Sequence, residues 1–136
     1  MAAYLLDTSA LLAHYRGEAG ADQVQEILLD DSAEVYIASP SIAEFARRAY
    51  SIGADAAGAR EVSLAYAGLA ARVIPVDTAV AIRAFEIALG ASSRLPLIDA
   101  LIAACASTVE AILVHRDEHF EALPSSTPER LMLSEG

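Results

Sequence analysis

Short apolar runs that alternate with helical segments constrain the fold of this 136-residue chain more than any other feature. Strands are expected at residues 3–6, 34–38, 72–76 and 111–114, with a weak edge strand at 131–133. A segment with helical features follows each of the first four runs. Alternation of this kind predicts a mostly parallel sheet of four or five strands with helices on both faces. The expected fold class is therefore α/β, with three layers in the order α/β/α.

Capping and chain-breaking residues mark the helical segments between these strands. Thr8 or Ser9 is expected to cap the first helix, and Ser39 the third, with Pro40 at its first helical position. Asp77 is the expected cap of the fifth helix. The predicted helices span residues 8–15, 21–29, 39–52, 55–70, 77–90, 96–107 and 118–123, with loops at 91–95 and 124–128.

Length and composition favour a single domain, residues 1–136, because a hydrophobic content of 55% is ample for one packed core. No apolar run approaches the roughly 20 residues of a membrane span, and no secretory signal is recognisable. Cys105 is the single cysteine, so no disulfide can form within the chain, and a buried structural role is expected for it. These features predict a cytoplasmic protein without membrane association.

Four acidic residues lie at the edges of apolar or small-residue runs: Asp7, Glu44, Asp99 and Asp117. A carboxylate near a protein core must be paired, hydrogen-bonded or bound to a cation, because an isolated buried charge is very costly. The chain has no lysine, and few of its nine arginines lie beside these acids in sequence. If the four side chains converge, a hard divalent cation is the natural counterion.

The predicted sheet brings three of these acids to one edge. Ligands of open parallel sheets bind outside the carboxyl ends of the strands, near the point where the strand order reverses. Asp7 ends the first strand, and Asp117 closely follows the fourth. Glu44 lies in the second turn of the helix after the second strand. Asp99 joins them only if the start of its helix folds back over that edge, which the sequence leaves open.

Four converging carboxylates repel one another, and one or two Mg²⁺ or Mn²⁺ ions would remove that repulsion. Such ions also support phosphodiester hydrolysis by activating water and by stabilising charge on the phosphorus centre. Zinc prefers nitrogen and sulfur ligands, so one cysteine and three scattered histidines do not suggest a zinc site. The net charge of −10 counts against nucleic-acid binding, unless bound cations reverse the local sign.

The segments around the four acids resemble the motifs of PIN-domain ribonucleases. Residues 6–11 (LDTSAL) are similar to the opening motif, and residues 39–45 (SPSIAEF) to the second. Residues 97–104 (LIDALIAA) resemble the distinctive third motif, and residues 113–120 (LVHRDEHF) the fourth. The resemblance covers almost the whole chain in the right order. Stand-alone PIN domains of this size are typically VapC toxins of toxin–antitoxin pairs.

This resemblance implies a metal-dependent endoribonuclease with a PIN-like fold. It implies that Asp7 and Asp99 are the principal ligands of Mg²⁺ or Mn²⁺. Glu44 would bind the metal or orient the attacking water, and Asp117 would hold a second ion or a bridging water. Ser9 is expected to hydrogen-bond a carboxylate of the site.

The same resemblance implies three kinds of partner. Structured RNA, including transfer RNA or ribosomal RNA, would be the substrate. A small antitoxin would cover the site with its C-terminal segment and bring an arginine near the acids. A second copy of the chain would form a homodimer, largely through the helices that follow the second strand. Whether the protein is a toxin or a housekeeping nuclease stays open at this stage.

Two histidines depart from the family pattern. His115 stands where relatives often have threonine or serine, and His119 stands where an acid is common. Both are candidate substrate contacts, and His119 could instead cover the site. Arg94 is a candidate for a contact with an RNA phosphate, with a plain loop role as the alternative. Arg116 could neutralise a phosphate or contact the antitoxin, with a plain surface role as the alternative.

Each acid also has a structural interpretation. The acids that follow strands could cap the next helices, and Asp99 could gain from the helix dipole. Glu44 could pair with Arg47 or Arg48 at helical spacing. Receiver domains and haloacid-dehalogenase-like phosphatases also have acidic Mg²⁺ pockets, but both use a lysine that this chain lacks. The remaining alternative is a non-catalytic PIN-like module that binds RNA or a protein partner.

Overall fold

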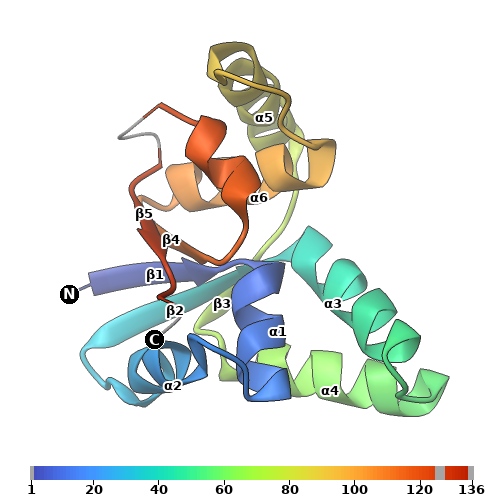
Figure 1. The fold of residues 1–136 in the computed structure, drawn as a ribbon. Helices are drawn as coiled ribbons and strands as arrows, with labels where there is room; N and C mark the ends of the chain where they lie inside the picture. Colours follow the sequence, from blue (N-terminus) through green and yellow to red (C-terminus); the bar gives the residue numbers. More distant parts are fainter. Residues whose placement is uncertain (1, 125–127, 135–136) are drawn as a thin grey trace.

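A parallel sheet of five strands lies at the centre of the computed structural model, which describes residues 2–124 and 128–134 (Figure 1). The order across the sheet is β3-β2-β1-β4-β5, and every neighbouring pair is parallel. The predicted α/β fold is thus confirmed. The strands are β1 (Ala2–Leu6), β2 (Ala33–Ala38), β3 (Arg72–Ile74), β4 (Ile112–His115) and β5 (Arg130–Met132).

Helices cover both faces of this sheet and complete the three layers (Figure 1). One face carries α1 (Thr8–Arg16), α2 (Ala21–Leu29), α3 (Ser39–Ser51) and α4 (Ala56–Leu69). The other carries α5 (Thr78–Gly90), α6 (Leu97–Thr108) and the short 3-10 helix η1 (Glu118–Ala122).

The two faces bury different halves of the core, because side chains alternate along a strand. Leu5 and Leu113 pack with α5 and α6, whereas Leu6 and Val114 pack with α1 and α3. Cys105 lies in the first of these clusters, and burial raises the pKa of its thiol to about 11. A thiol that stays protonated inside the core has the structural role predicted for it.

Two helix caps differ from the prediction. Asp7 caps α1 by accepting the backbone N–H of Ser9, so neither Thr8 nor Ser9 is the cap. α3 begins at Ser39 itself, without a side-chain cap, because β2 runs directly into the helix. In both places the strand leads into the helix with almost no loop, which moves the cap to the end of the strand.

The third strand and the helix after it lie close to their predicted positions, with one difference at the end of the strand. β3 ends at Ile74 rather than at residue 76, because Pro75 has no N–H to donate to the sheet. Asp77 caps α5 as expected and accepts the backbone N–H of Val80 at 2.9 Å.

The predicted loop at 124–128 includes residues 125–127, which lie outside the described residues. Within the described ranges, no helix is both long and apolar enough for a membrane span.

The reversal of strand order positions the candidate site. The chain winds from β1 through β2 to β3 in one direction, and β4 and β5 then lie on the other side of β1. Leu6 pairs with Val114, and the backbone N–H of Asp7 donates to the carbonyl of Val114 at 3.0 Å. The segments that follow β1 and β4 therefore leave the sheet side by side, which is where ligands of such sheets bind.

Candidate metal centre

Four acidic side chains from distant parts of the chain meet at the carboxyl edge of the sheet. Asp7 follows β1, Glu44 lies on α3, and Asp99 lies in the first turn of α6. Asp117 follows β4 and caps η1. The start of α6 thus folds over the edge, the point that the sequence left open. The cavity between them measures about 130 Å³ and is lined by Asp7, Thr8, Ser9, Leu12, Glu44, Arg48, Asp99 and Asp117.

Asp7 is a buried carboxylate with one satisfied and one unsatisfied oxygen. Its Oδ2 accepts hydrogen bonds from the backbone N–H of Ser9 at 2.9 Å and from the Ser9 hydroxyl at 2.5 Å. Among the described residues, no group hydrogen-bonds to its Oδ1. Burial raises the pKa of Asp7 to about 6. The hydrogen bonds from Ser9 lower this pKa, and the negative charges of Glu44 and Asp117 raise it further. Such an oxygen requires a proton or a cation.

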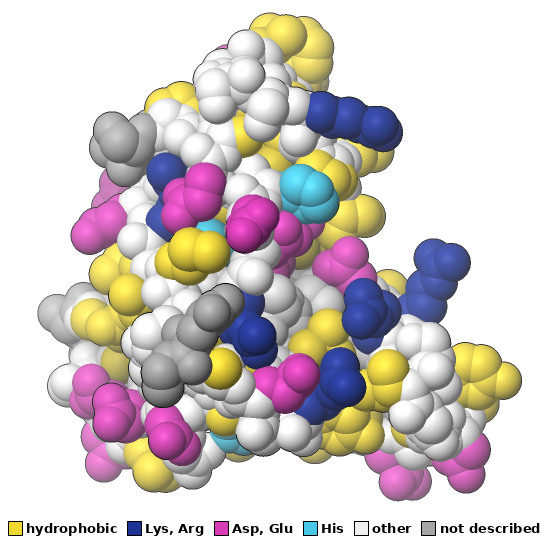
Figure 2. Space-filling view, viewed as in Figure 1, with side chains coloured by type: hydrophobic (Ala, Val, Ile, Leu, Met, Phe, Trp, Pro, Cys, Tyr) yellow, Lys and Arg dark blue, Asp and Glu magenta, His cyan; other side chains and the backbone are white. Residues whose placement is uncertain are grey.

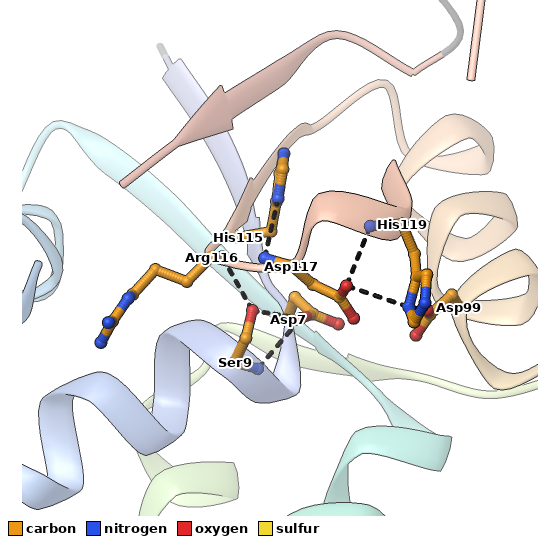
Figure 3. A network of polar contacts seen from close by, with 7 residues as sticks. All are labelled: Asp7, Ser9, Asp99, His115, Arg116, Asp117 and His119. Carbon is orange, nitrogen blue, oxygen red and sulfur yellow. Dashed lines mark hydrogen bonds and ion pairs between the residues drawn. The ribbon is translucent and has the colours of Figure 1, made fainter. Parts of the chain in front are cut away.

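Ser9 links Asp7 to the segment that follows β4 (Figure 3). Its hydroxyl donates to Asp7 and accepts the backbone N–H of Arg116 at 2.8 Å. The hydrogen bond from Ser9 to an acid of the site, expected from the sequence, is therefore present. Because its only hydroxyl proton goes to Asp7, Ser9 holds this carboxylate and the β4 segment in one arrangement.

Replacing Ser9 with alanine is expected to weaken Mn²⁺ binding by about 10- to 100-fold, the usual cost of losing a partner that orients a metal ligand. Isothermal titration calorimetry measures this effect. Ser32→Ala is the matched control, because Ser32 makes the same pair of hydrogen bonds to Asp30, at 2.9 and 2.6 Å, in an exposed turn. Equal Mn²⁺ affinities in the two variants would contradict a role for Ser9 in the site.

Asp99 and Asp117 come close together around His119 (Figure 3). His119 Nδ1 lies 3.2 Å from Asp99 Oδ2 and 3.0 Å from Asp117 Oδ1. Burial, followed by the charges of Asp117, Asp7 and Glu44, raises the pKa of Asp99 to about 7, against an opposing effect of His119. The acids therefore repel one another in the absence of a cation, and Asp99 keeps a proton more readily than Asp7 does.

His115 and His119, which the sequence suggested as substrate contacts, occupy different environments. The side chain of His119 is 56% exposed at the edge of the acidic group. His115 is fully buried, and its ring lies 5.0 Å from that of Phe120 in an edge-on arrangement. Burial lowers the pKa of His115, and its Nδ1 accepts the backbone N–H of Asp117 at 3.2 Å. A substrate contact by His115 would require its ring to leave the core.

The arginines are arranged differently from the sequence expectation. Arg94 is exposed on the loop before α6 and does not line the cavity. The side chain of Arg116 points away from the carboxylates (Figure 3). Arg48, which the sequence suggested only as a partner of Glu44, lines the cavity. In the sequence, the position of Arg48 one helical turn after Glu44 is the feature that could have placed it beside the acids. Among ion pairs of the described residues, none joins Glu44 to Arg47 or Arg48.

The donor set of this cavity fits a divalent cation. Carboxylate oxygens are the ligands that Mg²⁺ and Mn²⁺ prefer. Asp7 Oδ1 offers a buried oxygen without another partner. Ligand atoms of Asp99, Asp117 and His119 also lie within 4.8 Å of one another. The capping role of Asp7 does not compete with this one, since the cap uses Oδ2 and leaves Oδ1 without a partner. Asp117 Oδ1 accepts the backbone N–H of His119 and, like any carboxylate oxygen, has a second lone pair for a cation.

Solved structures share the fold over nearly their whole length. A chain of VapBC2 from Rickettsia felis, crystallised with a DNA fragment from its promoter, matches with a TM-score of 0.74 and 14% identity, covering 97% of this chain and 99% of that chain. VapBC-5 from Mycobacterium tuberculosis, of the VapBC family of toxin–antitoxin systems, matches with a TM-score of 0.68 and 24% identity, covering 98% and 100%. FitAcB from Neisseria gonorrhoeae matches with a TM-score of 0.69 and 22% identity, covering 95% and 96%.

At these identities the structural likeness establishes the fold alone. No curated protein matches the chain in sequence. The family described as the PIN domain matches residues 4–125, which is most of the chain and includes all four acidic residues of the cavity. Because the matched residues contain every helix from α1 to η1, the strands β2, β3 and β4, most of β1 and the segments that carry these acids, the chain belongs to the PIN domain family.

Proposed function

We propose that this protein is a metal-dependent endoribonuclease and the toxin of a toxin–antitoxin pair. The observation that carries the proposal is the unpartnered, buried oxygen of Asp7 inside a cavity lined by three further acids. A purely structural cluster would satisfy that oxygen with a proton donor, because burying an unpaired acceptor is costly. Membership of the PIN domain family supports the same conclusion.

Each acid has a distinct role in this proposal. Asp7 and Asp99 would hold the ion, and Asp117 would hold a second ion or a bridging water. Glu44, which is only partly buried, accepts a hydrogen bond from the attacking water and orients it toward the phosphate. A bound Mg²⁺ or Mn²⁺ would lower the pKa of water and stabilise charge on the phosphate group. The raised pKa values of Asp7 and Asp99 mean that binding a cation displaces protons from the site.

Basic side chains beside the acidic group offset part of the negative charge. Figure 2 shows arginines on the side of the molecule where α1 and α3 lie, next to acidic side chains. Arg47 and Arg48 are exposed on α3, and Arg48 lines the cavity. Guanidinium groups bind phosphate with two parallel hydrogen bonds, so these residues suit the backbone of RNA. They allow an acidic protein to hold RNA at this one site.

An apolar groove between α3 and α4 supports the proposed antitoxin partner. It has a volume of about 650 Å³, and Ile42, Tyr50 and Leu64 line it together with Arg47 and Arg60. An amphipathic segment with apolar and acidic side chains would fit such a groove. α3 carries both the groove and Glu44, so a partner bound there lies close to the acidic cavity. A homodimer through the same helices stays a prediction, which size-exclusion chromatography would test.

Cleavage of RNA by the purified chain tests the proposal. Endonucleolytic products are expected with Mg²⁺ or Mn²⁺ and are expected to disappear with EDTA, because the acids alone cannot activate water for this reaction. Products are resolved on denaturing gels from end-labelled structured RNAs, including transfer RNA. Cleavage that persists in EDTA would refute the metal mechanism. Binding of RNA without cleavage in any metal would favour the non-catalytic PIN-like module instead.

A further inference from the structure

His119 places a nitrogen atom among the carboxylate oxygens of the site. Its Nδ1 lies 3.2 Å from Asp99 Oδ2 and 3.0 Å from Asp117 Oδ1. Two neighbouring ligands on an octahedral ion with bonds of about 2.1 Å are separated by about 3.0 Å. The nitrogen therefore has the spacing from both oxygens that a shared ion requires. Asp99 and Asp117 also line the cavity that Asp7 lines, and Asp7 Oδ1 has no hydrogen-bond partner among the described residues.

The backbone keeps this ring at the site even though the side chain is largely exposed. The backbone N–H of His119 donates to Asp117 Oδ1 at 2.9 Å, which fixes the first turn of η1. The next residue, Phe120, is fully buried and packs in the core with α6. Asp117 holds the backbone of His119, and the buried Phe120 holds the residue that follows it. The ring of His119 therefore stays within reach of both carboxylates.

We propose that His119 is a metal ligand and that its nitrogen makes the site prefer Mn²⁺ to Mg²⁺. This inference rests on the proposed metal site and adds its selectivity. Mg²⁺ takes oxygen ligands and keeps several waters. Mn²⁺ also favours oxygen ligands, but it is a first-row transition ion, and ions of this series accept an imidazole nitrogen more readily than Mg²⁺ does.

The ratio of the two metal affinities tests the proposal. His119→Asn is expected to weaken Mn²⁺ binding about tenfold or more and Mg²⁺ binding less than about threefold, as measured by calorimetry. His119→Asp restores an oxygen donor and is expected to lower the ratio of Mn²⁺ to Mg²⁺ affinity while retaining Mg²⁺. His14→Asn is the control, since His14 hydrogen-bonds Tyr66 and Gln25 outside the cavity. Equal losses for both metals, or no loss, would overturn the proposal.

Electron spin echo spectroscopy of bound Mn²⁺ gives a direct second test, whose first measurement uses the wild-type protein alone. The wild-type spectrum is expected to contain modulation from a coordinated imidazole nitrogen, which His14→Asn retains and His119→Asn loses. Bound Mn²⁺ without nitrogen modulation would show that His119 only hydrogen-bonds the carboxylates.

These measurements separate the two proposals. Nitrogen coordination without RNA cleavage would leave the role of His119 standing and contradict the nuclease. RNA cleavage together with a spectrum free of nitrogen modulation would support the nuclease and contradict the role of His119. A chain that binds neither metal would refute both.

Discussion

Asp99→Asn is expected to reduce RNA cleavage by more than about 100-fold, because even partners that only orient a metal ligand cost 10- to 100-fold. The substitution removes a charge from the centre of the acidic group with almost no change in shape. It should not unfold the protein, since the pKa of Asp99 is raised to about 7 and its charge opposes folding. Initial rates on a labelled RNA in saturating Mn²⁺ measure the effect.

Asp55→Asn provides the matched control for this experiment. Asp55 is exposed and caps α4 by accepting the backbone N–H of Gly58 at 2.7 Å, a role that asparagine can also fill. The control is expected to cleave at the wild-type rate. If the chain is a toxin, its expression slows growth, and Asp99→Asn but not Asp55→Asn relieves the effect. Full activity of Asp99→Asn would show that Asp99 takes no part in the reaction.

Removing the metal is expected to make the stability of the protein strongly dependent on pH. The pKa of Asp7 is raised to about 6 in the folded state, above its ordinary value of 3.8. A carboxyl group with a raised pKa binds more protons in the folded state, so stability decreases as pH rises through this range. The penalty is complete above about pH 6, amounts to about 3 kcal/mol for Asp7, and vanishes below the unfolded pKa. Asp99, with its pKa of about 7, acts in the same direction.

Urea unfolding of wild type and Asp7→Asn tests this expectation. In EDTA at pH 8 the variant is expected to be the more stable protein, and its advantage should shrink as the pH falls toward 4. Mn²⁺ at 1,000 times its Kd should reverse the order, because it stabilises the wild type by about 4.1 kcal/mol, which exceeds the penalty from Asp7. A variant that is less stable than wild type in EDTA at pH 8 would mean that the buried carboxylate helps to hold the fold together.

Local chemistry explains why so many elements could be predicted from the sequence. Asp77 caps α5, and Pro75 stops β3, through effects that reach only a few residues. The misplaced caps of α1 and α3 show the limit of such rules. Ser9 and Ser39 have the right chemistry for capping, but the preceding strands run so close to the helices that the helix start moves.

The candidate site was only partly predictable for a related reason. Asp7 and Asp117 lie at the same edge because both follow strands that run in the same direction, and a parallel sheet ends all its strands at that edge. By contrast, the sequence suggested Arg94 and His115 as substrate contacts, yet Arg94 does not line the cavity and His115 is buried beside Phe120. The direction of a side chain depends on the neighbours that pack around it, and those neighbours come from other elements.

The sequence by itself determined which segments form strands and helices and which acids leave the sheet at its carboxyl edge, because periodicity and strand direction are local properties. The tertiary structure alone decided that β4 lies beside β1, that α6 brings Asp99 to this edge, and that His119 reaches both Asp99 and Asp117. These features depend on how helices pack across the sheet between residues far apart in the chain. For the same reason, the pKa of Asp99 and the unpartnered oxygen of Asp7 arise only when the chain is folded.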